Sequence, residues 1–176
     1  MWTFILIKFS CFFLTHAYYI PNENGDLKNA LDGCPVGWVN AQSLGCFKFL
    51  ATSRNVTWFE AHNLCELQGG YLAEPTVAEQ MEFLSGLAFM EQEFTGITHW
   101  WIGLSDFSHE GTWVWSHTSE EANKMFWDNG SPHSSTGNKE DCVFMEFKHE
   151  SLNWIDGDCS IISYTSFEVF HPPPFR

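Results

Sequence analysis

Two stretches in the first half of the chain carry apolar residues at helical intervals. In the first stretch, the apolar residues on one face are Trp58, Ala61, Leu64 and Cys65. Thr57 and Glu60 have the spacing of a capping box, in which each side chain satisfies a backbone N–H at the start of a helix. Two glycines follow, Gly69 and Gly70, and glycine commonly ends helices. The pattern predicts a helix that begins after Thr57 and ends at these glycines.

The second stretch repeats the arrangement. Thr76 and Glu79 again have capping-box spacing. The apolar residues that continue at helical intervals are Val77, Met81, Leu84 and Ala88. A second helix is therefore expected, joined to the first by the short link "YLAE".

After His99 the chain changes to short aromatic and β-branched runs separated by Gly, Asn, Asp and Ser, which predicts a sheet with long loops. The runs are "WWIGLSD", "GTWVWSH", "MFW", "CVFMEF" and "SYTSFEVF". Trp113 and Trp115 alternate around Val114 and could form a platform for sugar rings. Packing in the core is favoured, because large aromatic side chains fill sheet interiors first.

The N-terminal third contains three different segments. Residues 1–17, "MWTFILIKFSCFFLTHA", have the apolar run and the small residues near Ala17 that are typical of a cleaved signal peptide. Residues 18–33 contain turn residues without a sustained period, which indicates a flexible spacer. Cys34 and Cys46 bracket a turn-rich segment that leads into strand-type aromatic residues, so they are candidates for a local disulfide.

This segment order predicts a secreted, extracellular protein. An uncleaved membrane anchor at the N-terminus is the alternative, but the apolar run is short and contains Lys8, and no later stretch is long enough to span a membrane. Six cysteines in 176 residues agree with an oxidising compartment, and five remain once Cys11 is removed with the leader. In that compartment Asn55, in the sequon Asn55-Val56-Thr57, is a candidate for N-glycosylation.

Charge and motifs argue against two broad classes of function. The net charge of -14 leaves no basic stripe that could bind a phosphate backbone, so nucleic acid is not an expected partner. The chain also lacks a zinc-protease His-Glu-x-x-His, a Gly-x-Ser-x-Gly elbow, a phosphate-binding glycine loop and a Cys-x-x-Cys pair. We therefore expect a binding protein and not an enzyme.

Several motifs together resemble the C-type lectin-like domain in its long form, as found in secreted invertebrate lectins. They are "CPVGW…GCFKF", "TWFEAHNLC", "GGYLAE", "WWIGL", "GTWVW" and "EDC…NWIDGDC", and their order and spacing agree over residues 34–168. The resemblance implies an α+β fold with two helices packed on antiparallel sheets, stapled by disulfides, with a long inserted loop. Residues 169–176 would then be a C-terminal tail.

In sugar-binding members the long loop carries a calcium ion, held by a Glu-Pro-Asn or Gln-Pro-Asp triplet, a downstream acid and a Trp-Asn-Asp motif. The corresponding triplet here is Ser131-Pro132-His133, in which only the proline is kept. Glu140 matches the downstream acid and Asp156 the last motif acid, but Ile155 replaces the motif asparagine.

These departures predict weak or absent calcium binding. Calcium takes about six to eight oxygen ligands, and serine and imidazole are poor replacements for a carboxylate or an amide oxygen. Asp141 matches an acid that some members use for a neighbouring calcium and could hold a weaker ion. The alternative is that Glu140, Asp141 and Asp156 are solvated loop acids. His133 is expected to be a surface histidine rather than a metal ligand.

The resemblance also implies the cysteine pairing. Cys142 would pair with Cys159, and Cys34 with Cys46, whereas the usual partner of Cys65 in the last strand is replaced by Phe167 or a neighbour. Cys65 would then be left over. It could be a buried thiol packed against Phe167, it could link two chains as a dimer, or the sequence after Cys159 could be altered.

Two functions follow from these expectations. The first is a secreted lectin-like protein that binds glycans through the long-loop face, with a degraded calcium site. The second is a calcium-independent module that binds a protein or another surface without recognising sugar. Pro132, Glu140 and Asp156 favour the first, whereas Ser131, His133 and Ile155 favour the second.

Overall fold

The computed structural model describes residues 19–21, 27–29, 34–35, 37–50, 56–133, 139–161 and 165–170. The helices are α1 (Trp58–Leu67), α2 (Ala78–Thr95) and the short 3-10 helix η1 (Gln42–Leu44). The strands are β1 (Tyr19–Pro21), β2 (Leu27–Asn29), β3 (Val39–Asn40), β4 (Cys46–Leu50), β5 (Tyr71–Leu72), β6 (His99–Ser105), β7 (Val114–Trp115), β8 (Cys142–Lys148), β9 (Ser151–Gly157) and β10 (Thr165–Phe170). The expected leader, the sequon residue Asn55, the side chain of Phe167 and residues 171–176 lie outside this description.

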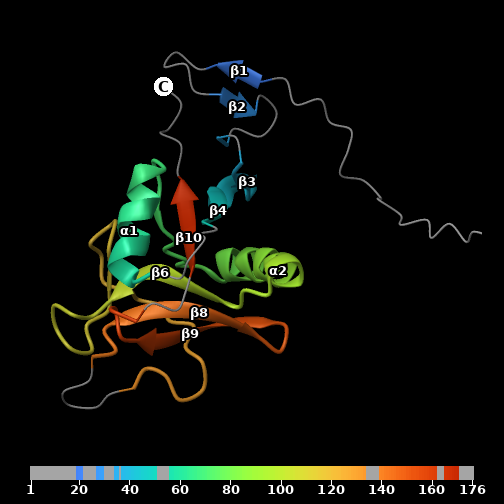
Figure 1. Ribbon diagram of the computed structural model, residues 1–176. Coiled ribbons are helices and arrows are strands. Elements are labelled where there is room, and N and C mark those ends of the chain that lie inside the picture. The colour runs from blue at the N-terminus through green and yellow to red at the C-terminus, as the bar shows by residue number, and fades with distance from the viewer. Residues whose placement is uncertain are drawn as a thin grey trace, which may run out of the picture.

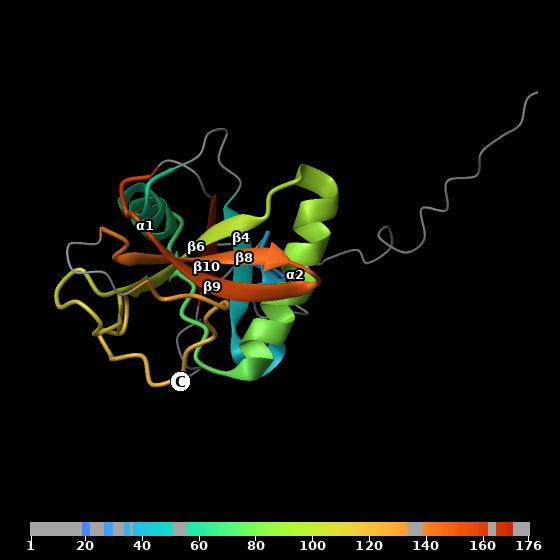
Figure 2. The ribbon, with the colours of Figure 1, turned by 90° about the horizontal axis from the view of Figure 1, so that it is seen from below.

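Eight of the described strands form one sheet, in which neighbours follow the order β3-β4-β10-β6-β8-β9, with β5 paired to β10 and β7 paired to β6. The pairs are antiparallel except that β10 runs parallel to β6. Figures 1 and 2 show α1 and α2 on either side of β10. The expected fold class, two helices packed on a mainly antiparallel sheet with disulfides, is confirmed.

Strand β6 divides the core into two clusters, because successive side chains of a strand point to opposite faces. Trp100, Ile102 and Leu104 lie in a cluster with the buried face of α2, whereas Trp101 lies in a cluster with the buried face of α1. Each of these four side chains has no exposed surface. Trp113 and Trp115 are also buried in the α2 cluster, which confirms the expectation that they belong to the core.

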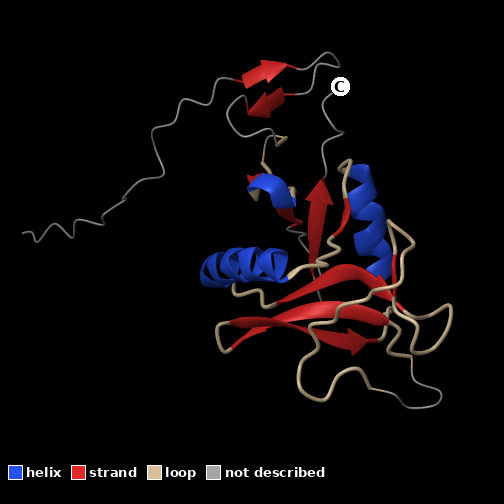
Figure 3. Cartoon of the chain, turned by 180° about the vertical axis from the view of Figure 1, so that it is seen from behind, coloured by secondary structure: helices blue, strands red, loops and turns tan. Residues whose placement is uncertain are grey.

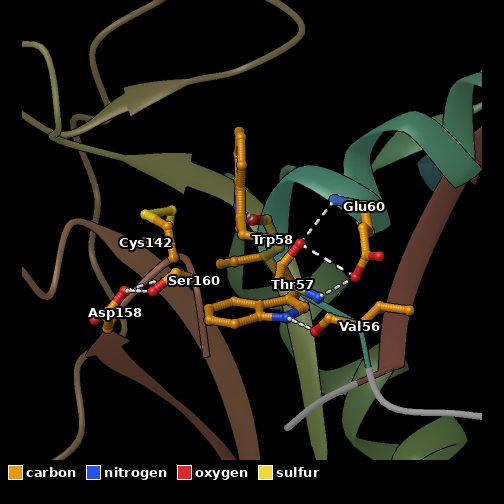
Figure 4. The surroundings of a disulfide bond; sticks show 10 residues. Val56, Thr57, Trp58, Glu60, Cys142, Asp158 and Ser160 are labelled. Atoms are coloured by element: carbon orange, nitrogen blue, oxygen red, sulfur yellow. Dashed lines mark hydrogen bonds between the residues drawn. A yellow bond between two sulfur atoms is a disulfide. The ribbon is translucent and has the colours of Figure 1, made fainter. Parts of the chain in front are cut away.

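The start of α1 is tied to the rest of the domain by several hydrogen bonds (Figure 4). The capping box is present: the Glu60 N–H donates to Thr57 Oγ1 at 3.2 Å, and the Thr57 N–H donates to Glu60 Oε2 at 3.0 Å. The Trp101 indole donates to the Val56 carbonyl at 3.0 Å, and the Trp58 N–H donates to the Cys159 carbonyl at 3.1 Å. The helix start is therefore held both by its own sequence and by the sheet.

Two disulfides close loops in the described chain. Cys34 is bonded to Cys46, with 5.7 Å between the Cα atoms, and Cys142 is bonded to Cys159, with 5.1 Å between them. Cys65 takes part in neither of these bonds and is fully buried in the α1 cluster. A disulfide from Cys65 to a second chain would therefore require this part of the core to open.

Four details differ from the sequence expectations. The spacer at 18–33 contains paired strands, β1 and β2, and the sequence between them includes Asn24-Gly25, a pair typical of hairpin turns. The run "MFW" makes an isolated bridge from Trp127 to Trp154 in place of a strand. Strand β10 extends to Phe170, two residues into the expected tail. The fourth difference is at the start of α2.

The cap of α2 is built from Gln80 and not from Glu79. The N-cap residue is Val77, which has no side-chain acceptor, and the Gln80 side-chain oxygen accepts from the N–H groups of Thr76, at 2.8 Å, and Val77, at 3.3 Å. Glutamine can fill this role as well as glutamate, so the shift by one residue leaves the helix itself as expected.

Within the described residues, neither helix is both long and apolar enough to cross a membrane. The loops gather at the end of β8 and β9 that lies away from their shared turn, as Figure 3 shows. This loop-bearing end contains the residues that sequence analysis selected.

Candidate functional site

The loop-bearing end of the sheet holds a cluster made of His133, Glu140 and Asp156. Asp156 lies on β9, opposite Val143 of β8, and Glu140 comes two residues before β8 begins. His133 belongs to the long loop that precedes them in the chain. The ladder between β8 and β9 thus fixes Asp156, whereas Glu140 lies in the segment just before β8 and the loop brings the histidine to both acids.

The three side chains are close enough to share one ligand. His133 Nδ1 lies 3.0 Å from Asp156 Oδ1 and 3.6 Å from Glu140 Oε2. One ligand atom from each residue lies within 4.8 Å of the others. The Asp156 side chain is 1% exposed, compared with 37% for Glu140 and 55% for His133, so the cluster has a buried base and an open side.

The loop backbone is anchored to the same acid. The His133 N–H donates to Asp156 Oδ2 at 2.6 Å, which leaves Oδ1 to face the imidazole. Further back, the Asp128 N–H donates to the Trp154 carbonyl at 2.8 Å, and the Ser131 N–H donates to the Asp128 carbonyl at 3.1 Å. The Ser131–Pro132 peptide between these contacts is cis. The approach of His133 to Asp156 therefore follows from how the loop is attached to β9.

The other residues that sequence analysis selected lie around this cluster without joining it. Asp141 follows Glu140, and its carbonyl accepts from the Asp106 N–H at 3.0 Å. Ile155 packs partly buried against the α1 cluster and offers no ligand atom. Thus His133, Glu140 and Asp156 come together, whereas Asp141 and Ile155 are not members of the group.

The donor set is a poor fit for calcium. Glu140 and Asp156 supply at most four carboxylate oxygens, and one of these, Asp156 Oδ2, already accepts from the loop backbone. His133 presents a ring nitrogen, and calcium prefers about six to eight oxygen ligands. The chemistry at this position matches a smaller ion with mixed nitrogen and oxygen ligands better than it matches calcium.

Asp106 is a buried acid that sequence analysis did not select. It is 3% exposed and accepts from the Gly111 N–H at 2.8 Å through Oδ2, while Oδ1 has no hydrogen-bond partner among the described residues. Burial, with the nearby negative charges of Glu110 and Asp141, raises the pKa of Asp106. In the sequence Asp106 ends the run "WWIGLSD", and a lone acid that follows an apolar strand cannot be distinguished there from a solvated one.

Exposed aromatic side chains form a second feature that the sequence pattern did not reveal. Phe59 and Phe107 are about half exposed and their rings lie 6.0 Å apart, both in edge contact with Trp58. They line a pocket of about 400 Å³ together with His62 and other residues. This pocket lies between α1 and the chain that follows β6.

One further contact between a histidine and an acid is explained by the sheet. His99 Nε2 lies 3.2 Å from Glu146 Oε1, and these residues are directly opposite each other on β6 and β8. Burial lowers the pKa of His99, while Glu146 acts in the opposite direction. Directly opposed side chains on antiparallel strands meet as a matter of geometry, so the contact requires no catalytic role.

Comparisons with known proteins agree with this geometry. Residues 54–165 match the model of the family described as the Lectin C-type domain. The chain is 29% identical over 128 residues to "Perlucin-like protein" from Mytilus galloprovincialis, covering 71% of this chain and 75% of that protein. It is 31% identical over 133 residues to "C-type lectin domain family 4 member M" from Nomascus concolor, covering 74% of this chain but only 30% of that protein.

Solved structures show the same fold. The carbohydrate-recognition domain of cow CD23, determined in the presence of a GlcNAc2Man3 oligosaccharide, superposes with a TM-score of 0.64 at 24% identity and covers 80% of this chain and 98% of its own. A calcium-independent type II antifreeze protein superposes with a TM-score of 0.62 at 23% identity, covering 78% and 94%. With the family match over most of the described domain, these findings show that the chain belongs to the C-type lectin domain family.

Proposed function

We propose that this protein is a secreted recognition protein that binds carbohydrate through the long-loop face, with little help from calcium. The observation that carries the proposal is the convergence of His133, Glu140 and Asp156 at the loop-bearing end of the sheet. An open cluster with a buried acid at its base offers charged hydrogen-bond acceptors to sugar hydroxyls, and such bonds are stronger than neutral ones. The family match supports a binding role for this face.

A glycan-binding assay tests this proposal directly. The protein is screened on a glycan array while calcium is raised from none to millimolar. We expect binding that Glu140→Ala weakens and that calcium changes little. Glu93→Ala, which removes an exposed acid from α2, is the matched control and should leave binding unchanged.

Two results would contradict the proposal in different ways. A requirement for micromolar calcium would show that the calcium site is intact despite its donor set. Absence of glycan binding at every calcium concentration would remove the sugar ligand altogether and favour the second candidate.

The second candidate is a calcium-independent module that binds a protein or another surface. It is favoured by the loss of ligand atoms at Ser131, His133 and Ile155, and one structural neighbour of the same fold is described as calcium-independent. The exposed pair Phe59 and Phe107 would supply apolar contact area, since aromatic residues are enriched in protein interfaces. A Phe107→Ser variant that lost partner binding while keeping its fold would support this candidate.

We propose that the protein binds calcium only weakly. Beside the main cluster, Asp141 and the buried Asp106 are candidates for holding a weaker ion, because the unsatisfied Asp106 Oδ1 would gain a partner. Calorimetric titration with calcium measures both positions together. Saturable binding below millimolar would refute the argument from the missing oxygens.

Secretion and glycosylation complete the proposal. They are supported by the leader-like residues 1–17, by the sequon at Asn55 and by the two disulfides, which persist in oxidising compartments. Expression in secretory cells should place the protein in the medium. Treatment with an N-glycosidase should increase its mobility on a gel, and an Asn55→Gln variant should not respond.

A further inference from the structure

We infer that His133, Glu140 and Asp156 form a three-ligand site for a zinc ion, so that the long loop has exchanged calcium for a transition metal. This inference goes beyond sugar recognition and does not depend on it. It concerns only which ion the chain's own side chains select.

The two separations from His133 Nδ1 are compatible with a tetrahedral ion, and all three ligand atoms lie within 4.8 Å of one another. In such a site, with zinc bonded to nitrogen and oxygen at about 2.0–2.2 Å, neighbouring ligand atoms lie roughly 3.3–3.5 Å apart. The observed separations from His133 Nδ1, 3.0 Å to Asp156 Oδ1 and 3.6 Å to Glu140 Oε2, bracket that value. Small movements of the exposed histidine and glutamate would suffice to complete the geometry.

The surroundings of Asp156 provide a second, independent support. Its carboxylate is nearly fully buried on β9, and Oδ2 accepts from the His133 N–H, which fixes the orientation of Oδ1 toward the cluster. Hydrogen bonds of this kind to a ligating carboxylate hold metal ligands in place. The open side formed by His133 and Glu140 leaves room for a water molecule as the fourth ligand.

The ligand chemistry selects the ion. A neutral imidazole nitrogen suits zinc, copper and nickel, and suits calcium and magnesium poorly. Two carboxylates balance the charge of a divalent ion, and one of them, that of Asp156, is nearly fully buried. His133 therefore favours a transition metal over calcium at this position of the loop.

The competing explanation is that the His133–Asp156 contact is only a hydrogen bond that fastens the loop. A metal titration separates the two. The purified full chain is stripped with chelator, dialysed and titrated with zinc by calorimetry in the absence of glycans, and with cobalt by visible absorption. We expect one ion per chain and the absorption bands of tetrahedral cobalt.

Four variants decide the assignment. His133→Ala and Glu140→Gln should each lower zinc affinity by about tenfold or more. His109→Ala, which removes an exposed histidine outside the cluster, should have no effect. His133→Asp, which makes the donor set all oxygen, should weaken zinc and strengthen calcium.

The proposal is overturned if zinc binds without saturation, or if His133→Ala binds zinc as tightly as the native chain. It is also overturned if calcium at equal concentration displaces the zinc. Thermal unfolding of each variant without metal verifies that the fold is retained, which is expected because His133 and Glu140 are both partly exposed. Glycan binding is measured separately, so failure of the metal site and failure of sugar recognition give different results.

Discussion

Asp156 and Asp106 are equally buried acids at the same end of the sheet, yet their surroundings differ. Both are 3% exposed. Asp156 receives a backbone N–H on one oxygen and faces the imidazole of His133 with the other. Asp106 receives one backbone N–H from Gly111, and its second oxygen lies unpartnered among the described residues, near the charges of Glu110 and Asp141. Burial alone therefore does not determine how much a carboxylate contributes to the stability of the fold.

The largest expected effect is at Asp156. Asp156→Ala leaves the partly buried His133 N–H without its acceptor, and losing a hydrogen bond to a charged group should lower the free energy of unfolding by about 2 kcal/mol. Urea denaturation followed by tryptophan fluorescence measures the change. Asp156→Asn keeps an acceptor and is the control. Equal stability of the alanine variant and the native chain would show that Asp156 does not anchor the loop.

The next effect concerns the single backbone support of Asp106. Gly111 has φ of 77°, so Gly111→Ala should cost about 1–2 kcal/mol through left-handed strain, and should also disturb the bond to Asp106. Gly37→Ala is a matched control, since Gly37 has φ of 84° and no atom that an added methyl group would meet. If both variants lose the same stability, the contact with Asp106 adds nothing beyond strain.

A smaller effect of opposite sign is expected for Asp106→Asn. The raised pKa of Asp106 means that its contribution to stability is full below the pKa of the unfolded chain and is lost as pH rises through the folded pKa. Asparagine cannot ionise, so the gain in melting temperature over the native chain should grow from pH 4 to pH 7. A gain in melting temperature that shrank from pH 4 to pH 7 would show that folding lowers the pKa of Asp106 instead of raising it.

Comparing the native chain with Asp106→Asn also shows whether Asp106 binds an ion. Millimolar calcium should raise the melting temperature of the native chain more than that of Asp106→Asn if the unsatisfied oxygen takes part. Equal shifts would place any calcium elsewhere.

The smallest effect on stability is expected for His133→Ala. The imidazole is more than half exposed, so solvent screens its contact with Asp156 and the free energy of unfolding should fall by only about 0.5 kcal/mol. The backbone bond from position 133 to Asp156 should survive. Differential scanning calorimetry in metal-free buffer provides the measurement, and a loss as large as that of Asp156→Ala would mean that the side chain, not the backbone, holds the loop.

Sequence reasoning was strongest where local rules act alone. The start of α1 follows from Thr57 and Glu60, because both capping bonds form between residues three positions apart. At α2 the choice between Glu79 and Gln80 depended on which side chain could fold back over the N-terminus, and the pattern could not distinguish them. The presence of both helices was thus predictable from the sequence, whereas the residues that cap them were less predictable.

The site was only partly predictable. The resemblance selected Glu140, Asp156 and the loop residues Ser131, Pro132 and His133, and the structure brings His133, Glu140 and Asp156 together. The contact of His133 depends on how the loop backbone is attached to β9, which residue type does not reveal. The burial of Asp106 arises from contacts with residues distant in sequence, so a lone acid after a strand was not distinguishable from a solvated one.

The position of β10 has a consequence for biosynthesis. This last strand of the described chain inserts between β4 and β6, pairing antiparallel with the first and parallel with the second. While the ribosome still holds β10, both neighbours present open strand edges, and such edges invite pairing with other chains. The centre of the sheet can therefore close only after β10 has left the ribosome, and a chain terminated before Thr165 should aggregate.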